Sequence, residues 1–199
     1  MKARRQVKPN FRPVGTSFGT CFGRALGFAL AAATLLASGP VQAAEIQPAD
    51  VEAAVRSLGF VDNLQGHTPI VIGVVFKQGD ADSKAAAQRI AGMLAGLAGP
   101  NGAKIAADIM TANELGQGNR RVDVLYIVPG AVENNRAVGE VTRRQHVVSI
   151  SNDPACLTAQ CCMLMVRAGA RTEIVLDTAL ACESGATFSS VFMMMVKRK

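Results

Sequence analysis

Residues 146–188 read HVVSISNDPACLTAQCCMLMVRAGARTEIVLDTALACESGATF, and this stretch decides how the fold ends. A strand is expected at His146–Ile150, and a loop with several cysteines follows it. Two apolar runs, Met163–Arg167 and Arg171–Leu176, are joined by three small residues, which predicts an antiparallel hairpin. A helix is expected to leave from Asp177.

Upstream of this stretch, apolar runs rich in β-branched residues alternate with helical patterns. Strands are predicted at Pro69–Phe76, Lys104–Thr111 and Val122–Val128. Helices are predicted at 48–59, 82–98 and 133–144. This order is typical of a parallel sheet with crossover helices. The predicted fold class is therefore α/β, a mostly parallel sheet with crossover helices plus a C-terminal antiparallel β-hairpin and helix.

The first 43 residues have the three parts of a secretory signal. A basic region is followed by the apolar run Ala25–Ala37, whose 13 residues are too few to span a bilayer comfortably. Val41–Gln42–Ala43 supplies small residues, so cleavage is predicted after Ala43. Arg4–Arg5 leaves the twin-arginine route open beside the general secretory route, and an uncleaved anchor is the alternative. We expect a periplasmic protein, a single domain at 44–199, and no direct membrane insertion after cleavage.

The excess of positive charge belongs to this leader. Residues 1–43 hold six of the 21 basic residues and none of the 15 acidic ones, which leaves 15 of each in the remainder. A neutral domain has no long-range field that attracts a polyanion. No nucleic-acid partner is expected.

The four cysteines of the exported chain are Cys156, Cys161, Cys162 and Cys182. An even number in an oxidising compartment predicts disulfides. Cys156 can pair with either Cys161 or Cys162, whereas a bond between the neighbours Cys161 and Cys162 is disfavoured; Cys182 could bond the remaining cysteine across the hairpin. The bridges are either structural, worth about 2–4 kcal/mol, or reducible and able to switch a binding surface. Both interpretations stay open.

No pattern of residues predicts catalysis or metal binding. Residues 44–199 contain no Gly-x-Ser-x-Gly elbow, and His67 and His146 are not at ligand spacing from a cysteine. Consecutive Met193–Met195 point around a helix and cannot converge on copper, while Met163 and Met165 alternate on a strand. We expect the methionines to pack in the core. The hypothesis is a non-enzyme without metal or cofactor.

From Val71 to Val196 the chain resembles the YfiR family of exported bacterial proteins. The resemblance rests on "IGV" in the first strand, on "VDVLYIV", on "HVVSISNDP", on Met163–Leu164 opening the hairpin, and on "DTALACESGATFSSVFMMMV". Gly185, Ser189 and Ser190 fall where the family's closing pattern has a glycine and a serine pair. The chain departs from the family at Cys161–Cys162, where a glycine pair is usual, at Asp177 instead of asparagine, and in having no tryptophan.

The resemblance implies a periplasmic regulator that represses an inner-membrane diguanylate cyclase, and so acts in cyclic di-GMP signalling. It would contact the periplasmic domain of that enzyme, with disulfides supporting the fold and the repression. The expected contact surface is the loop and hairpin at 152–176, whose outer strand would be an exposed edge. The candidate contact residues are Asn152, Asp153, Leu157, Arg167, Arg171 and Glu173. A homodimer is compatible with this hypothesis.

Small-molecule binding is the alternative function. The predicted parallel sheet resembles one lobe of a periplasmic solute-binding protein, and ligands of such sheets favour the carboxyl ends of the strands. The chain is too short for two lobes with a cleft between them. A role as an outer-membrane accessory protein also stays open.

Overall fold

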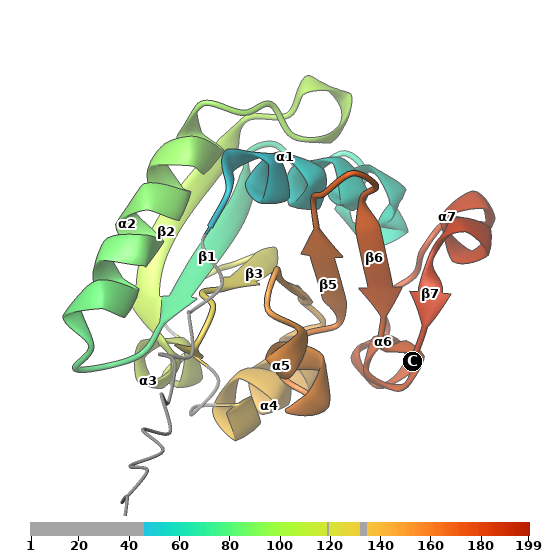
Figure 1. The fold of residues 1–199 in the computed structure, drawn as a ribbon. Helices are drawn as coiled ribbons and strands as arrows, with labels where there is room; N and C mark the ends of the chain where they lie inside the picture. The colour runs from blue at the N-terminus through green and yellow to red at the C-terminus, as the bar shows by residue number, and fades with distance from the viewer. Residues whose placement is uncertain (1–45, 119, 132–134) are drawn as a thin grey trace, which may run out of the picture. The chain divides into compact units, whose positions relative to one another are not determined.

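The computed structural model describes residues 46–118, 120–131 and 135–199, which are coloured in Figure 1. The predicted secretory signal and its cleavage position lie outside the described residues. Among the described helices, none combines the length and the apolar character needed to cross a membrane.

The described part of the chain forms one seven-stranded sheet in the order β2-β1-β3-β4-β5-β6-β7 (Figure 1). The strands are β1 (Ile70–Phe76), β2 (Ile105–Thr111), β3 (Val124–Ile127), β4 (Val148–Ser151), β5 (Leu164–Arg167), β6 (Glu173–Leu176) and β7 (Lys197–Arg198). Strands β1 to β5 are parallel, β6 is antiparallel to β5, and β7 is parallel to β6. The predicted fold class is confirmed.

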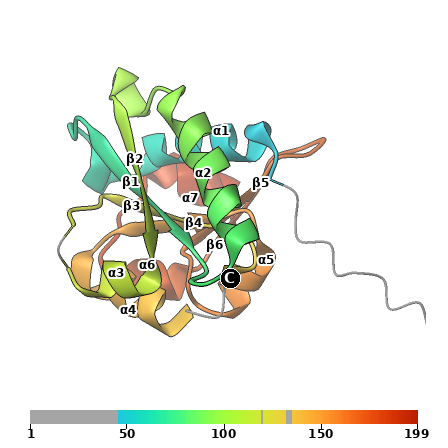
Figure 2. The ribbon, with the colours of Figure 1, turned by 90° about the vertical axis from the view of Figure 1, so that its left-hand side faces the viewer.

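Helices cover both faces of the sheet. They are α1 (Pro48–Ser57), α2 (Ala81–Ala95), α3 (Ala112–Gly116), α4 (Asn135–Gln145), α5 (Pro154–Thr158), α6 (Thr178–Ser184) and α7 (Ser190–Met195). Helices α1 and α2 contact each other on one face, and α4 contacts α3 and α6 on the other (Figure 2). This division follows from the topology: β1 leads to β2 on one side, while β3, β4 and β5 follow on the other side, and right-handed crossovers then place their helices on opposite faces.

The core lies between these layers. All four residues of β3 are buried, as is nearly all of β1, because helices cover both faces of these central strands. On α4, Val138 and Val141 point inward as predicted, each with 1% of its surface exposed.

Segments from opposite ends of the domain bond to each other. Phe60 O accepts from Ser189 N at 2.9 Å, and Asp62 N donates to Thr187 O at 3.0 Å. The side chain of Asn63 accepts from Thr187 Oγ1 at 2.6 Å, across 124 positions of sequence. The last helices therefore close over the segment that follows α1.

Two elements were not predicted from the sequence. Helix α5 lies inside the cysteine-bearing loop, where the Asp153 side chain accepts from Ala155 N at 2.9 Å and caps it. Strand β7 lies at Lys197–Arg198, where the sequence predicts no strand, and it pairs with β6 at Val175 and Leu176. The expectation that the outer hairpin strand is the sheet edge is therefore wrong: β7 is the edge.

Candidate functional site

Polar groups gather at the carboxyl ends of the parallel strands. Asn113, after β2, donates to the Gln78 side chain, after β1, at 2.6 Å. Asp153, after β4, accepts from Gly130 N, after β3, at 3.1 Å. Because the chain leaves β1 and β3 toward opposite faces, the sheet has its topological switch point between them, where ligands of open α/β sheets commonly bind.

A buried carboxylate, that of Asp50, joins α1 to the carboxyl ends of the strands. Asp50 is 3% exposed, and it accepts hydrogen bonds from Asn152 Nδ2 at 2.9 Å and from Ala168 N at 2.6 Å. Asn152 follows β4 and Ala168 follows β5, so one side chain fixes both strand ends beneath α1. Burial raises the pKa of the nearby Tyr126, and the negative charge of Asp50 adds to that effect. Neither Tyr126 Oη nor Asn152 Oδ1 has a hydrogen-bond partner in the described structure.

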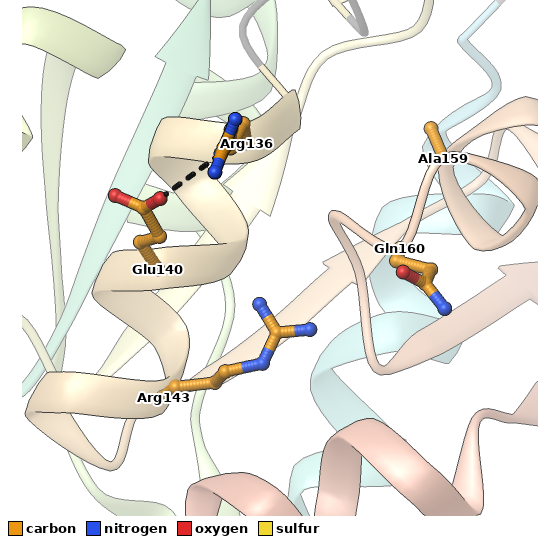
Figure 3. A pocket seen from close by; sticks show the side chains of 5 residues that line it. All are labelled: Arg136, Glu140, Arg143, Ala159 and Gln160. Atoms are coloured by element: carbon orange, nitrogen blue, oxygen red, sulfur yellow. Dashed lines mark hydrogen bonds and ion pairs between the residues drawn. The ribbon is translucent and has the colours of Figure 1, made fainter.

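A cavity of about 420 Å³ lies between α4 and the turn that follows α5 (Figure 3). Its lining residues are Arg136, Glu140, Arg143, Ala159 and Gln160. Figure 3 shows the Arg143 guanidinium extending from α4 toward Gln160 on the opposite wall. We call this space the α4–α5 cavity. Its volume lies within the range of about 300–1,000 Å³ that is usual for small-molecule sites.

Gly139 allows the two walls of the α4–α5 cavity to approach each other. A Cβ atom at this position would lie 2.8 Å from Gln160 O and 3.1 Å from Arg143 Nη1. Gln160 has a φ of 55°, so the turn after α5 directs its carbonyl group at the helix. Helix α4 therefore packs directly against backbone at this point, and a larger residue at 139 would separate the walls.

Ion pairs position the charged groups of the cavity. Arg143 Nε donates to Glu183 Oε2, on α6, at 2.5 Å, which holds the Arg143 side chain away from α4. Arg136 Nε donates to Glu140 Oε1 at 3.3 Å, one turn further along the same helix. In both pairs the contact involves Nε, so the terminal guanidinium nitrogens have further donor capacity. The cavity thus offers guanidinium donors, one carboxylate and one side-chain amide.

Three buried thiols, Cys156, Cys161 and Cys162, lie close to this cavity in the chain. Cys161 and Cys162 directly follow its lining residue Gln160. The sulfur atoms of Cys156 and Cys161 are 2.7 Å apart, and all four cysteines of the domain are free thiols in this structure. Burial raises the pKa of Cys156, whereas side-chain hydrogen bonds from Cys156 and Cys162 lower the pKa of Cys161. Of the pairings considered from the sequence, Cys156 with Cys161 therefore has two sulfur atoms in direct contact. Cys182 is exposed on α6.

The residues proposed from the sequence as a partner-binding surface differ in their exposure. Asn152 and Leu157 are buried, and Asp153 caps α5. Arg167 is exposed and donates to Asn152 O at 3.4 Å. Arg171 is exposed at the turn of the hairpin. Glu173 accepts from Lys197 Nζ at 2.6 Å, and this contact lowers its pKa.

The methionines divide into two groups. Met163 and Met165 are buried, as predicted. Met194 and Met195 are 77% and 62% exposed, so the expectation that they pack in the core is wrong. The reason is that Phe192 takes the inward position of α7 and stacks on Phe60 at a centroid distance of 5.1 Å.

Sequence reasoning did not find the α4–α5 cavity. Its charged residues were visible only as a polar side of the helix predicted at 133–144, where Arg136 and Glu140 have the spacing of an ordinary surface ion pair. No signal in the sequence connects Arg143 with Gln160, since tertiary packing brings them together.

Comparisons with known proteins give a likeness of fold. No protein-family model matches the chain, and no curated protein sequence matches it. A solved structure from Streptococcus pneumoniae, described as the ABC domain in complex with L-Trp, aligns with a TM-score of 0.55 and 10% identity over 75% of this chain and 60% of that one. A conserved domain protein from Vibrio cholerae O1 biovar El Tor strain N16961 aligns with a TM-score of 0.53 and 12% identity over 76% of this chain and 60% of that one.

These likenesses place the described domain among α/β domains of the same architecture. The chain spans 60% of the length of each of these two structures. At 10% and 12% identity the alignments concern the fold alone.

Proposed function

We propose that the domain binds a small zwitterionic solute, of the class of free amino acids, in the α4–α5 cavity. The observation that carries this proposal is the set of opposite charges around a cavity of about 420 Å³, with Arg136 and Arg143 beside Glu140. A guanidinium matches the geometry of a carboxylate, and a carboxylate accepts from an ammonium group. A molecule that carries a carboxylate and an ammonium group a short distance apart can bind the arginines and Glu140 of the cavity at the same time.

The arrangement of partners supports this choice of ligand. Glu183 holds Arg143 through Nε, so a ligand carboxylate can bind the terminal nitrogens without displacing the ion pair. The Gln160 side chain, on the opposite wall, adds a neutral donor and acceptor. One of the structural neighbours is described as holding L-Trp, a zwitterion of this class.

Calorimetric titration of the purified protein with the free amino acids tests the proposal. Two derivatives of any amino acid that binds separate its charges: the methyl ester lacks the carboxylate and the N-acetyl form lacks the ammonium group. We expect both derivatives to bind at least about tenfold more weakly, because a hydrogen bond to a charged group contributes about 1.5–3 kcal/mol and 1.4 kcal/mol corresponds to a factor of ten.

A matched pair of variants locates the site. Arg143→Met removes the guanidinium that faces the cavity and should weaken binding by about tenfold or more. Arg144→Met removes the neighbouring exposed guanidinium, which does not line the cavity, and should leave the affinity unchanged. Absence of binding by every amino acid, or equal losses in both variants, would refute the proposal.

A second candidate is the regulatory role implied by the resemblance to the YfiR family. The observation that favours it is the exposure of two cations of the hairpin, Arg167 and Arg171, both among the candidate contact residues. Titration against the periplasmic domain of a diguanylate cyclase tests this role. Arg171→Glu should weaken such binding, and absence of binding by the unmodified protein would refute it.

A further inference from the structure

The exposed large apolar side chains of the described residues all lie on α7. They are Val191, Met194 and Met195, with 54%, 77% and 62% of their surfaces exposed. At 3.6 residues per turn these three positions fall within an arc of about 100°. They form one apolar face, which we call the α7 face. Contiguous apolar surface of this kind marks interaction sites in proteins.

The α7 face is fixed in its exposed orientation. Phe192, which lies outside this arc, is fully buried and stacks on Phe60 and on Phe188, the latter at a centroid distance of 5.4 Å. The Ser189 side chain accepts from Phe192 N and caps the helix. Rotating α7 to hide its methionines would remove Phe192 from the core, so the exposure belongs to the native packing.

An apolar cavity adjoins α7. Its volume is about 280 Å³, and α6, α7 and the segment between them supply most of its lining. Its apolar lining side chains include Ala181, Ala186, Phe188 and Met193. Met193, the lining residue that α7 supplies, lies about 150° around the helix from the centre of the α7 face, so this cavity is no part of that face.

The strand that follows α7 has an unpaired side. Strand β7 pairs with β6 and ends the sheet, as Figure 1 shows. Lys199 N donates to Leu176 O at 2.9 Å, and alternate residues of a strand direct their backbone groups to opposite sides. The N–H and C=O of Arg198 therefore face away from β6, and Met195 of the α7 face precedes Arg198 by three residues in the chain. These groups can pair with an added strand.

The charges of this region decide which occupant fits. Two copies of β7 pairing with each other would bring Lys197 and Arg198 of both copies together, and like charges on paired strands are destabilising. An anionic membrane would need an excess of cations, but Lys197 pairs with Glu173 at 2.6 Å and Lys199 with Asp177 at 3.2 Å. Among the described residues, no carboxylate forms an ion pair with Arg198, whose guanidinium donates to Met193 O at 3.0 Å.

We infer that the α7 face and β7 together dock an extended segment of another protein in which acidic and apolar residues alternate. The segment adds to the sheet beside β7, places its apolar side chains over Met194 and Met195, and presents a carboxylate to Arg198. Main-chain bonds to the edge supply affinity, and the alternate side chains supply specificity.

The test uses the purified protein and two capped seven-residue peptides, one alternating glutamate with isoleucine and one alternating lysine with isoleucine. Fluorescence anisotropy gives the affinities, and amide chemical shifts report whether the N–H of Arg198 is involved. We expect the glutamate peptide to bind at least tenfold more tightly than the lysine peptide and to shift the Arg198 amide. Equal binding, or shifts confined to other regions, would overturn the inference.

Two variants test the surface itself. The double substitution Met194→Gln and Met195→Gln changes exposed side chains, so the melting temperature should hold while binding of the glutamate peptide falls at least tenfold. Arg198→Glu should reverse the preference between the peptides, and Arg144→Glu on α4 should not. Sedimentation tests whether a second copy of the chain binds this surface, and flotation with phosphatidylglycerol vesicles tests whether an anionic membrane does. Self-association or vesicle binding that the double variant abolishes would overturn the inference.

Discussion

Replacing Asp50 with alanine should cost a large part of the stability of the domain. The carboxylate is 3% exposed and accepts from Asn152 Nδ2 at 2.9 Å and from Ala168 N at 2.6 Å. The buried Asn152 amide and the half-buried Ala168 N–H would both lose their partner, and each bond to a charged group contributes about 1.5–3 kcal/mol. The expected loss in the free energy of unfolding is roughly 3–5 kcal/mol, and the melting temperature should fall by about 10 °C.

Urea unfolding followed by circular dichroism measures this loss, with the slope of the transition checked for constancy. Glu52→Ala is the matched control, because Glu52 lies on the same helix but is exposed and forms a surface ion pair with Arg56. That variant should change the stability by no more than about 0.5 kcal/mol. A loss below about 1 kcal/mol for Asp50→Ala, or an equal loss for Glu52→Ala, would refute the argument that Asp50 joins α1 to the strand ends.

Three further outcomes are expected. Tyr126 is the one tyrosine of the chain, and burial raises its pKa, so the folded protein should show no phenolate absorbance near pH 10–11. The stability of the domain should be unaffected by this group below the unfolded pKa of about 10 and should fall as the pH rises above it. Phenolate formation in the folded protein at about pH 10 would contradict this prediction. Gly139→Ala should destabilise the domain by about 1–3 kcal/mol, because the added Cβ would lie 2.8 Å from a backbone oxygen. Gly92→Ala, at a helical position with nothing within 4 Å of the added Cβ, should stabilise the domain by about 0.4–1 kcal/mol. Similar effects of the two substitutions in thermal unfolding would argue against close packing of α4 on the carbonyl of Gln160. Mild oxidation should form a disulfide between Cys156 and Cys161 and stabilise the domain by about 2 kcal/mol. Thiol titration should then find two of the four thiols of the domain. Peptide mapping that finds another cysteine pair would exclude this bridge.

Much of the sheet was predictable because its central strands are buried on both faces. The sequences of β1 and β3 are continuously apolar. Such a sequence is typical of a strand that helices cover on both faces. Strand β7 could not be predicted, since Lys197 and Arg198 have no apolar pattern and take strand conformation by pairing with β6. Helix α5 has five residues, too few for a helical period to be visible.

The candidate site was predictable only where it is local in sequence. Cys156 and Cys161 are five positions apart in the sequence, and in the structure their sulfur atoms lie 2.7 Å apart as free thiols. The cavity, by contrast, depends on Gly139, which lets α4 approach the carbonyl of Gln160. A glycine in a helix carries no sign of what it contacts, so no sequence pattern connects the two walls.

The bonds between the segment after α1 and the segment before α7 have a consequence for the timing of folding. The Asn63 side chain and the Phe60 carbonyl bond to Thr187 and Ser189, so a chain still emerging from the ribosome lacks these bonds until almost the whole domain has been synthesised. Contacts of such sequence separation form late, after the entropy of closing a long loop has been spent. The domain therefore completes its tertiary structure only near the end of its synthesis.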